Sequence, residues 1–180
     1  KYFGEDQVHD RDQFRKDRLY NDAVEAILKK YKRKLKLFFH STADRVKYIS
    51  WDCWRKFLEN THSIDEEFSR RQAGLVFQWS KMRVSDEIKG HEHVELINFT
   101  GFLEMIARIA DYKSFPTHET LSEAGYTNFS DYQRAWKTNA RLWLGRRPSA
   151  GGFEKKKTQH LSYKLDCFLE HWEAMNWLPK

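Results

Sequence analysis

ISWDCWRKFL at residues 49–58 and INFTGFLEMI at residues 97–106 share one apolar pattern, and this pattern decides the fold of the chain. Each stretch begins with an isoleucine at the end of a polar segment and continues into an amphipathic helical pattern. The large apolar side chains recur in the same order, with Trp54, Phe57 and Leu58 in the first stretch and Phe102, Met105 and Ile106 in the second. A helical pattern also precedes each polar segment. The repeat therefore predicts two helix–loop–helix units.

Together, the two units resemble a pair of EF-hands, the helix–loop–helix motifs of calmodulin-like proteins. The resemblance covers residues 23–114, and residues 97–111 are most similar to the exiting helix of EF-hand proteins from cilia and flagella. It implies an all-α fold, a degenerate EF-hand pair followed by a C-terminal helical extension. It also implies that Ile49 and Ile97 pair as a minimal β bridge between the two loops.

The first loop lacks most of the ligands that calcium needs. A calcium loop supplies oxygens at positions 1, 3, 5 and 9, a glycine at position 6 and a bidentate glutamate at position 12. When Ile49 is set at position 8, the positions 1, 3, 5, 6 and 12 fall on Thr42, Asp44, Val46, Lys47 and Cys53. Only the aspartate is a strong ligand, so these positions are vestigial and we expect no metal here.

The second loop departs from the calcium pattern in a different way. With Ile97 at position 8, Gly101 stands where the glutamate belongs, and the distance back to Ser80 is about ten residues too long. The insertion carries acidic residues at Asp86, Glu87, Glu92 and Glu95. We interpret it as a solvated acidic loop, with an irregular ion site as the alternative.

Composition agrees with a helical, basic protein. The chain has 180 residues, a net charge of +6, 16% aromatic residues and three prolines, so long helices and a real core are expected. The positive charge suits an acidic partner. No apolar run reaches the ~20 residues that span a bilayer. Cys53 and Cys167 are interpreted as buried thiols in a reducing compartment.

The sequence divides into five parts by pattern and composition. They are an N-terminal arm at 1–22, the lobe at 23–114, a helical extension at 115–145, a basic linker at 146–157 and a C-terminal amphipathic helix at 158–180. Residues 1–17 of the arm are expected to be extended, because they are polar and have no clear apolar period.

Polar residues that can cap a helix stand before the expected helices. The candidates are Ser50 or Asp52, Asp65 or Ser63, Thr117, and Asn128 or Ser130. Gly125 is expected to end the short helix that Thr117 begins.

The first helix of the lobe has an apolar stripe and a basic run. The stripe is formed by Val24, Ile27, Leu28, Tyr31, Leu35 and Phe38. The basic residues between these positions are Lys29, Lys30, Lys32, Arg33, Lys34 and Lys36. We interpret them as the solvated side of a helix, with a specific anion-binding face as the alternative.

Residues expected to contact a partner lie in the C-terminal third. The basic ones are Arg134, Lys137 and Arg141 on a helix, and Arg146, Arg147, Lys155, Lys156 and Lys157 in the linker. The apolar ones are Leu165, Phe168 and Trp172, a seam that packs either on the lobe's groove or on another chain.

Motifs of catalysis are missing from the sequence. It has no glycine-rich phosphate loop, nucleophile elbow or zinc-protease helix, and His91 and His93 lack a third ligand, so they are interpreted as part of a polar loop. We therefore expect no enzyme activity, no cofactor and no small-molecule substrate.

Three function classes remain. The favoured one is a calcium-independent structural module in the cytoplasm, in a cytoskeletal, microtubule-associated assembly of the cilium or flagellum axoneme, with tubulin or other axonemal proteins as partners and no membrane contact. The alternatives are a calcium sensor with atypical EF-hands and a nucleic-acid binder that uses the basic C-terminal segment. Trp136 and Trp143 share the apolar face of their helix, which disfavours nucleic acid.

Overall fold

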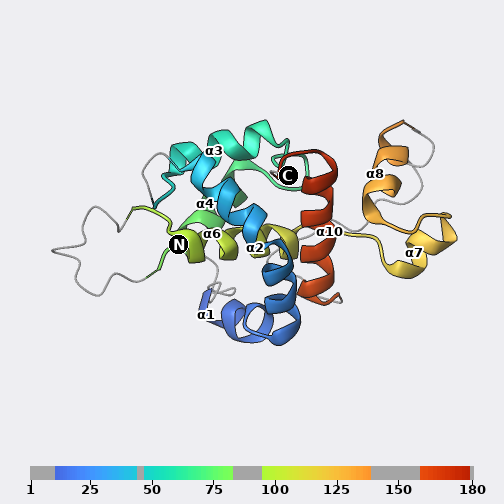
Figure 1. Cartoon of the computed structure of the whole chain (residues 1–180), viewed down its shortest axis with the longest axis horizontal. Coiled ribbons are helices and arrows are strands. Elements are labelled where there is room, and N and C mark those ends of the chain that lie inside the picture. Colours follow the sequence, from blue (N-terminus) through green and yellow to red (C-terminus); the bar gives the residue numbers. More distant parts are fainter. Residues whose placement is uncertain (1–10, 44–46, 83–94, 139–158, 179–180) are drawn as a thin grey trace, which may run out of the picture.

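The computed structural model describes residues 11–43, 47–82, 95–138 and 159–178, and most of these residues lie in helices that are joined by short loops (Figure 1). The helices are α1 Arg11–Phe14, the π-helical turn η1 Arg15–Leu19, α2 Asp22–Thr42, α3 Trp51–Asn60, α4 Arg70–Trp79, α6 Phe99–Tyr112, α7 His118–Glu123, α8 Phe129–Thr138 and α10 Leu161–Ala174. Within the described ranges the β structure consists of one isolated bridge. The predicted all-α class is confirmed.

That bridge joins Ile49 and Ile97, as predicted. The Ile49 backbone N–H donates to the Ile97 carbonyl oxygen at 2.8 Å, and the Ile97 N–H donates to the Ile49 carbonyl oxygen at 3.0 Å. Both isoleucine side chains are buried. The two predicted exiting helices, α3 and α6, therefore begin side by side.

The repeated apolar side chains also meet in the core. The rings of Trp54 and Phe102 lie edge to face, with centroids 6.4 Å apart. Phe102 also contacts Phe39 at the end of α2, at a centroid distance of 5.4 Å. Each of these three side chains is at most 2% exposed. Aromatic pairs at such distances add to the stability that burial provides.

Helix α6 is the centre of the molecule. It packs against α2, α4 and α10, and it is buried on every side from Phe102 to Tyr112 except at the half-buried Leu103. A helix enclosed in this way is expected to be apolar all around, as this one is except for three charged residues. Asn98 caps it, since its side-chain oxygen accepts the Gly101 N–H at 2.9 Å.

Three of the helix starts match the expected caps, and one of them is Asn128 before α8, whose side-chain oxygen accepts the Asp131 N–H at 2.9 Å. Ser50 caps α3, where its hydroxyl accepts the Cys53 N–H at 3.4 Å. Thr117 caps α7 by accepting the Thr120 N–H at 3.2 Å, and Gly125 ends that helix with a φ of +78°, a conformation that favours glycine.

One cap differs from the expectation. α4 begins after Ser69, whose backbone N–H donates to Gln72 at 3.1 Å, and not after Asp65 or Ser63. Asp65 instead accepts the Phe68 N–H at 2.8 Å, in the turn before the helix. The aspartate therefore stabilises a turn, and the helix begins one turn later.

The N-terminal arm is the largest error of the prediction. Residues 11–19, which we call the N-terminal segment, form the helical turns α1 and η1 instead of an extended arm. Phe14 and Leu19 of this segment are each only 8% exposed. The segment docks on the rest of the molecule by the contacts described below.

Helix α10 folds back on the lobe, which decides between the two alternatives left open for its apolar seam. Leu165, Phe168 and Trp172 are 0%, 3% and 0% exposed. The Trp172 ring lies 5.2 Å from that of Phe57 and 6.0 Å from that of Phe38. As contacts for another chain these three residues were therefore wrongly assigned, because they complete the core of their own chain. In Figure 1, α10 stands between this core and the pair α7 and α8.

Candidate interaction surface

The cations of α2 separate into two groups according to the direction in which they point. Lys30 and Lys34 face α10. The Lys30 ammonium lies 2.8 Å from a carboxylate oxygen of Asp166, and Lys34 forms an ion pair with Glu173. The partner carboxylate raises the pKa of Lys30 above its ordinary value, so it remains charged at neutral pH.

The second group points away from the core. It belongs to a surface that we call the α2 outer face, formed by Lys29, Lys32, Arg33, Lys36, Leu37 and His40, all of them exposed. Lys29 pairs with Glu25 at 2.8 Å one turn earlier on the same helix. Lys32, Arg33 and Lys36 have no acidic partner among the residues that the structure describes.

Leu37 gives the α2 outer face an apolar element. It is 46% exposed, and the other large exposed apolar side chains of the described ranges, Tyr20 and Met175, lie outside α2. Because residues four apart on a helix are neighbours, Leu37 lies beside Arg33. The surface thus combines one exposed aliphatic side chain with three cations that have no acidic partner in the described part of the chain.

The predicted basic contacts are described only in part. Arg134 on α8 is exposed and pairs with Asp131 at 3.2 Å. The side chain of Lys137 lies outside the described part of the chain. So do Arg141, Arg146, Arg147, Lys155, Lys156 and Lys157, together with Trp136 and Trp143.

At the first loop, Thr42 and Cys53, two of the vestigial positions, belong to helices α2 and α3. The Thr42 hydroxyl donates to the Phe38 carbonyl oxygen at 3.0 Å, which is a contact within α2. Cys53 is half-buried rather than buried as expected, and it packs against the edge of the hydrophobic core. Asp44 and Val46 fall outside the described residues, as do Asp86, Glu87, His91, Glu92 and His93 of the second loop.

At the second loop, α6 approaches the end of α4 closely. A Cβ atom at Gly101 would lie 2.7 Å from the Ser80 carbonyl oxygen and 3.0 Å from a methyl group of Ile97. Both neighbours are buried, and the first is backbone, which cannot swing aside. Glycine is therefore required at the position where a calcium loop carries its glutamate, and a glutamate would force the two helices apart.

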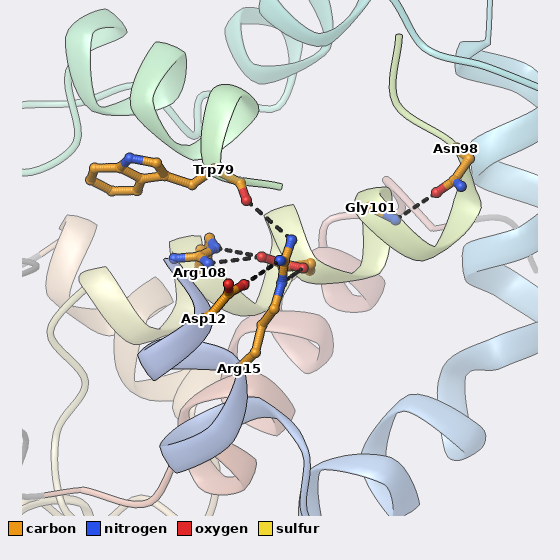
Figure 2. Close-up of polar contacts among 7 residues, drawn as sticks. Asp12, Arg15, Trp79, Asn98, Gly101 and Arg108 are labelled. Atoms are coloured by element: carbon orange, nitrogen blue, oxygen red, sulfur yellow. Dashed lines mark hydrogen bonds and ion pairs between the residues drawn. The ribbon is translucent and has the colours of Figure 1, made fainter. Parts of the chain in front are cut away.

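Beneath the N-terminal segment lies a charge cluster that the sequence analysis missed (Figure 2). Glu104, on α6, is 1% exposed and uses both carboxylate oxygens. One accepts Arg108 at 2.8 and 2.9 Å, and the other accepts the Arg15 Nε–H at 2.9 Å. Arg15 also donates to Asp12 at 2.8 Å and to the Trp79 carbonyl oxygen at 3.3 Å. We call Asp12, Arg15, Glu104 and Arg108 the Glu104 cluster.

Aromatic rings enclose the same cluster. The Arg108 guanidinium lies 4.2 Å from the centroid of the Phe14 ring and 5.8 Å from that of Trp79. Burial lowers the pKa of Arg108, and the neighbouring carboxylate of Glu104 acts in the opposite direction. A second ion pair joins Arg18 to Asp111 at 2.6 Å, and Arg18 also donates to the Gln159 carbonyl oxygen at 2.8 Å.

A signal for this docking is present in the sequence. Glu104, Arg108 and Asp111 recur every three or four residues and mark one charged stripe on an otherwise apolar helix. Arg15 and Arg18 stand three residues apart, about one helical turn, and pair with Glu104 and Asp111. Buried charges of this kind require charged partners. The stripe could therefore have predicted that a segment with basic side chains packs over this side of the helix.

The metal-ligating and nucleophilic side chains of the described residues can be placed in the structure. They contain no group of three or more histidines, cysteines or acidic residues that could hold a metal ion. Cys167 is buried, and burial raises the pKa of its thiol to about 11, which is the reverse of what a nucleophile needs. The His118 ring packs against Tyr163 at a centroid distance of 4.5 Å.

In the part of the chain that the structure describes, no helix combines the length and apolar character needed to cross a bilayer. Comparison of the chain with protein-family models, with curated proteins and with solved structures finds no match.

Proposed function

We propose that the chain is a non-catalytic, calcium-independent interaction module, built as a degenerate EF-hand pair and held in a cytoskeletal assembly of the cilium or flagellum. The observation that carries this proposal is the contact between Gly101 and Ser80. In a calcium loop the glutamate at position 12 binds the ion with two oxygens and thereby pulls the exiting helix inward. Here α6 reaches the end of α4 directly, and a backbone contact takes the place of the ion.

The Ile49–Ile97 bridge supports the same reading. Its two hydrogen bonds, at 2.8 and 3.0 Å, join the loops while both side chains are buried in the core. In the described part of the lobe, packing and this bridge join the two units without an ion, whereas a sensor opens a groove when it binds calcium. A permanently closed lobe is suited to a scaffold.

The partner that we propose is an acidic protein surface, with tubulin or another axonemal protein as the candidate. The net charge of +6 and the unpaired cations of the α2 outer face favour such a surface by long-range attraction. Nothing in the described residues favours a small-molecule substrate over this reading.

Calcium titration tests the calcium-independent part. Isothermal calorimetry and thermal melting with millimolar calcium should show no heat of binding and no change in Tm, because a ligand stabilises a protein only as far as it occupies the folded state. Magnesium serves as the control for ionic strength. A micromolar calcium site would overturn this part and favour the alternative of a calcium sensor.

Co-sedimentation tests the cytoskeletal part. The protein should pellet with microtubules equally in calcium and in chelator, and less as salt rises, because screening shortens the reach of exposed charges to ~10 Å or less. A protein that stays in the supernatant at low salt would overturn the microtubule assignment. Recovery that depends on nucleic acid would favour the nucleic-acid alternative.

A further inference from the structure

The α2 outer face carries positive charge that the described acidic residues leave largely unpaired. The cations of α2 that face α10 are neutralised by Asp166 and Glu173, which leaves Lys32, Arg33 and Lys36 exposed and without an acidic partner among the described residues. Lys32 and Lys36 are four residues apart, a spacing at which like charges repel and weaken a helix. The unpaired cations therefore do not stabilise their own helix.

The helix dipole does not explain these charges either. A helix C-terminus favours cations, but the effect fades beyond the last turn. In α2 the last turn carries only His40 as a basic residue, whereas Lys32, Arg33 and Lys36 lie before it. Their placement calls for a partner outside the helix.

From this arrangement we infer that the α2 outer face binds an extended acidic polypeptide segment, such as a glutamate-rich tail of the partner protein. This inference rests on the proposed function and names the surface that performs it. It also moves the binding surface away from the C-terminal residues that the sequence suggested.

The length of the surface fits such a segment. From Lys29 to His40 the helix rises through eleven residues, which is about 16 Å. An extended chain covers this distance with about five residues, so two or three acidic side chains on one side of it can reach the cations. Leu37 offers a contact for one apolar side chain among them.

Features of the same face argue against other anionic partners. Single-stranded nucleic acids are held by exposed aromatic rings, but the aromatic side chains of α2, at Tyr31, Phe38 and Phe39, are all buried. A membrane surface is bound by an apolar face of several residues, and Leu37 stands alone on α2. An acidic peptide needs neither feature.

The test uses the full chain and a labelled peptide of about ten residues, rich in glutamate, long enough to cover the face twice at ~3.3 Å per residue. Fluorescence anisotropy at low salt should show binding by the parent. The combined variant Lys32→Glu, Arg33→Glu, Lys36→Glu should bind at least about tenfold more weakly, since three surface ion pairs together account for about that factor.

A matched variant controls for net charge. Lys16→Glu, Lys56→Glu and Arg71→Glu reverse three exposed cations on η1, α3 and α4, outside the α2 outer face. The affinity of this control for the peptide should lie within about twofold of that of the parent, because direct contact and not net charge sets the affinity. Circular dichroism and Tm confirm that both variants fold, and Leu37→Ser should weaken binding by a smaller factor that salt does not change.

The outcomes separate this inference from the proposed function. Equal losses in the two triple variants, or none in the α2 variant, would overturn the α2 outer face as the site. If the α2 variant still pelleted with microtubules like the parent, the proposed function would stand and the inference would fail. If a short DNA duplex bound α2 more tightly than the acidic peptide did, the assignment to an acidic polypeptide would fall.

Discussion

Two segments at opposite ends of the described chain cover the central helices, and they do so by different physical means. The N-terminal segment contributes two apolar side chains, Phe14 and Leu19, and docks mainly through Arg15 and Arg18. Helix α10 inserts a buried apolar seam into the core, and its ion pairs with α2 lie at the exposed rim. The comparison teaches that the cost of removing one partner of an ion pair rises with its burial, because the other charge is then left buried and unpaired. This cost should be large at Glu104, which is 1% exposed, and small at the rim of α10, where the paired side chains are more than 30% exposed.

The largest effect is expected on the apolar side of this comparison. Trp172→Ala should lower the free energy of unfolding by about 3–5 kcal/mol, because it leaves a cavity between Phe38 and Phe57. Chemical denaturation measures the loss. As a control, Met175→Ala on the exposed end of the same helix should change stability by less than about 0.5 kcal/mol. Equal midpoints for the Trp172 variant and the parent would mean that α10 does not fold back.

Removing the buried carboxylate should cost somewhat less. Glu104→Gln keeps the shape of the side chain but leaves Arg15 and Arg108 without their shared counter-charge, and we expect a loss of about 3 kcal/mol. Limited proteolysis should then cut first within residues 11–19, since this segment loses its main anchor. A variant with parental stability and an uncut segment would show that the cluster is not what holds it.

The two segments should differ in how the stability of their contacts depends on alkaline pH. Burial raises the pKa of the Cys167 thiol on α10 from 9.0 to about 11, so the folded protein keeps a proton that the unfolded chain loses above pH 9. The folded state binds more protons between pH 9 and 11, and its stability therefore falls across this window, by up to about 2 kcal/mol. Arg15, whose pKa is raised, stays charged throughout.

The measurement is the difference in Tm between parent and Cys167→Ala at pH 8 and at pH 11. The parent should lose more stability than the variant on going to high pH. The same loss in both proteins would assign the effect to the tyrosines and lysines, which also titrate at high pH, rather than to this thiol.

The smallest change in unfolding free energy is expected for the exposed ion pairs between α2 and α10. Lys30→Ala removes the pair with Asp166, whose partners are 56% and 37% exposed, and should change the unfolding free energy by less than about 1 kcal/mol. This small change should shrink further at high salt, because screening weakens exposed pairs. A loss as large as that of Glu104→Gln would break the comparison.

The sequence predicted what local pattern determines. The burial of Trp54 and Phe102 followed from the repeated apolar spacing, and Thr117 and Gly125 marked both ends of α7. The pairing of Ile49 with Ile97 was implied by the resemblance to EF-hands. These features depend on neighbours close in the chain or on one repeat.

What could not be predicted depends on distant partners. The N-terminal segment was expected to be extended because two apolar residues make no helical period, and its anchors Glu104 and Asp111 lie 89 and 93 residues away. The basic run of α2 could be recognised in the sequence. The sequence did not show which of its cations form ion pairs, because the partners of Lys30 and Lys34 stand 136 and 139 residues further along. The apolar pattern of α10 is equally compatible with packing on its own lobe and on another chain, so the pattern alone could not distinguish the two.

The position of α10 in the chain also sets an order of events during synthesis. Phe38 on α2 and Phe57 on α3 are covered by Trp172, more than a hundred residues later, so both leave the ribosome well before the side chain that shields them. A nascent chain released in segments exposes such surface for as long as translation of the rest takes, at about 5–20 residues per second. For several seconds the apolar stripe of α2 is therefore exposed and available to chaperones. A slow codon or a premature stop before α10 would leave this surface exposed for longer and make the lobe prone to aggregate.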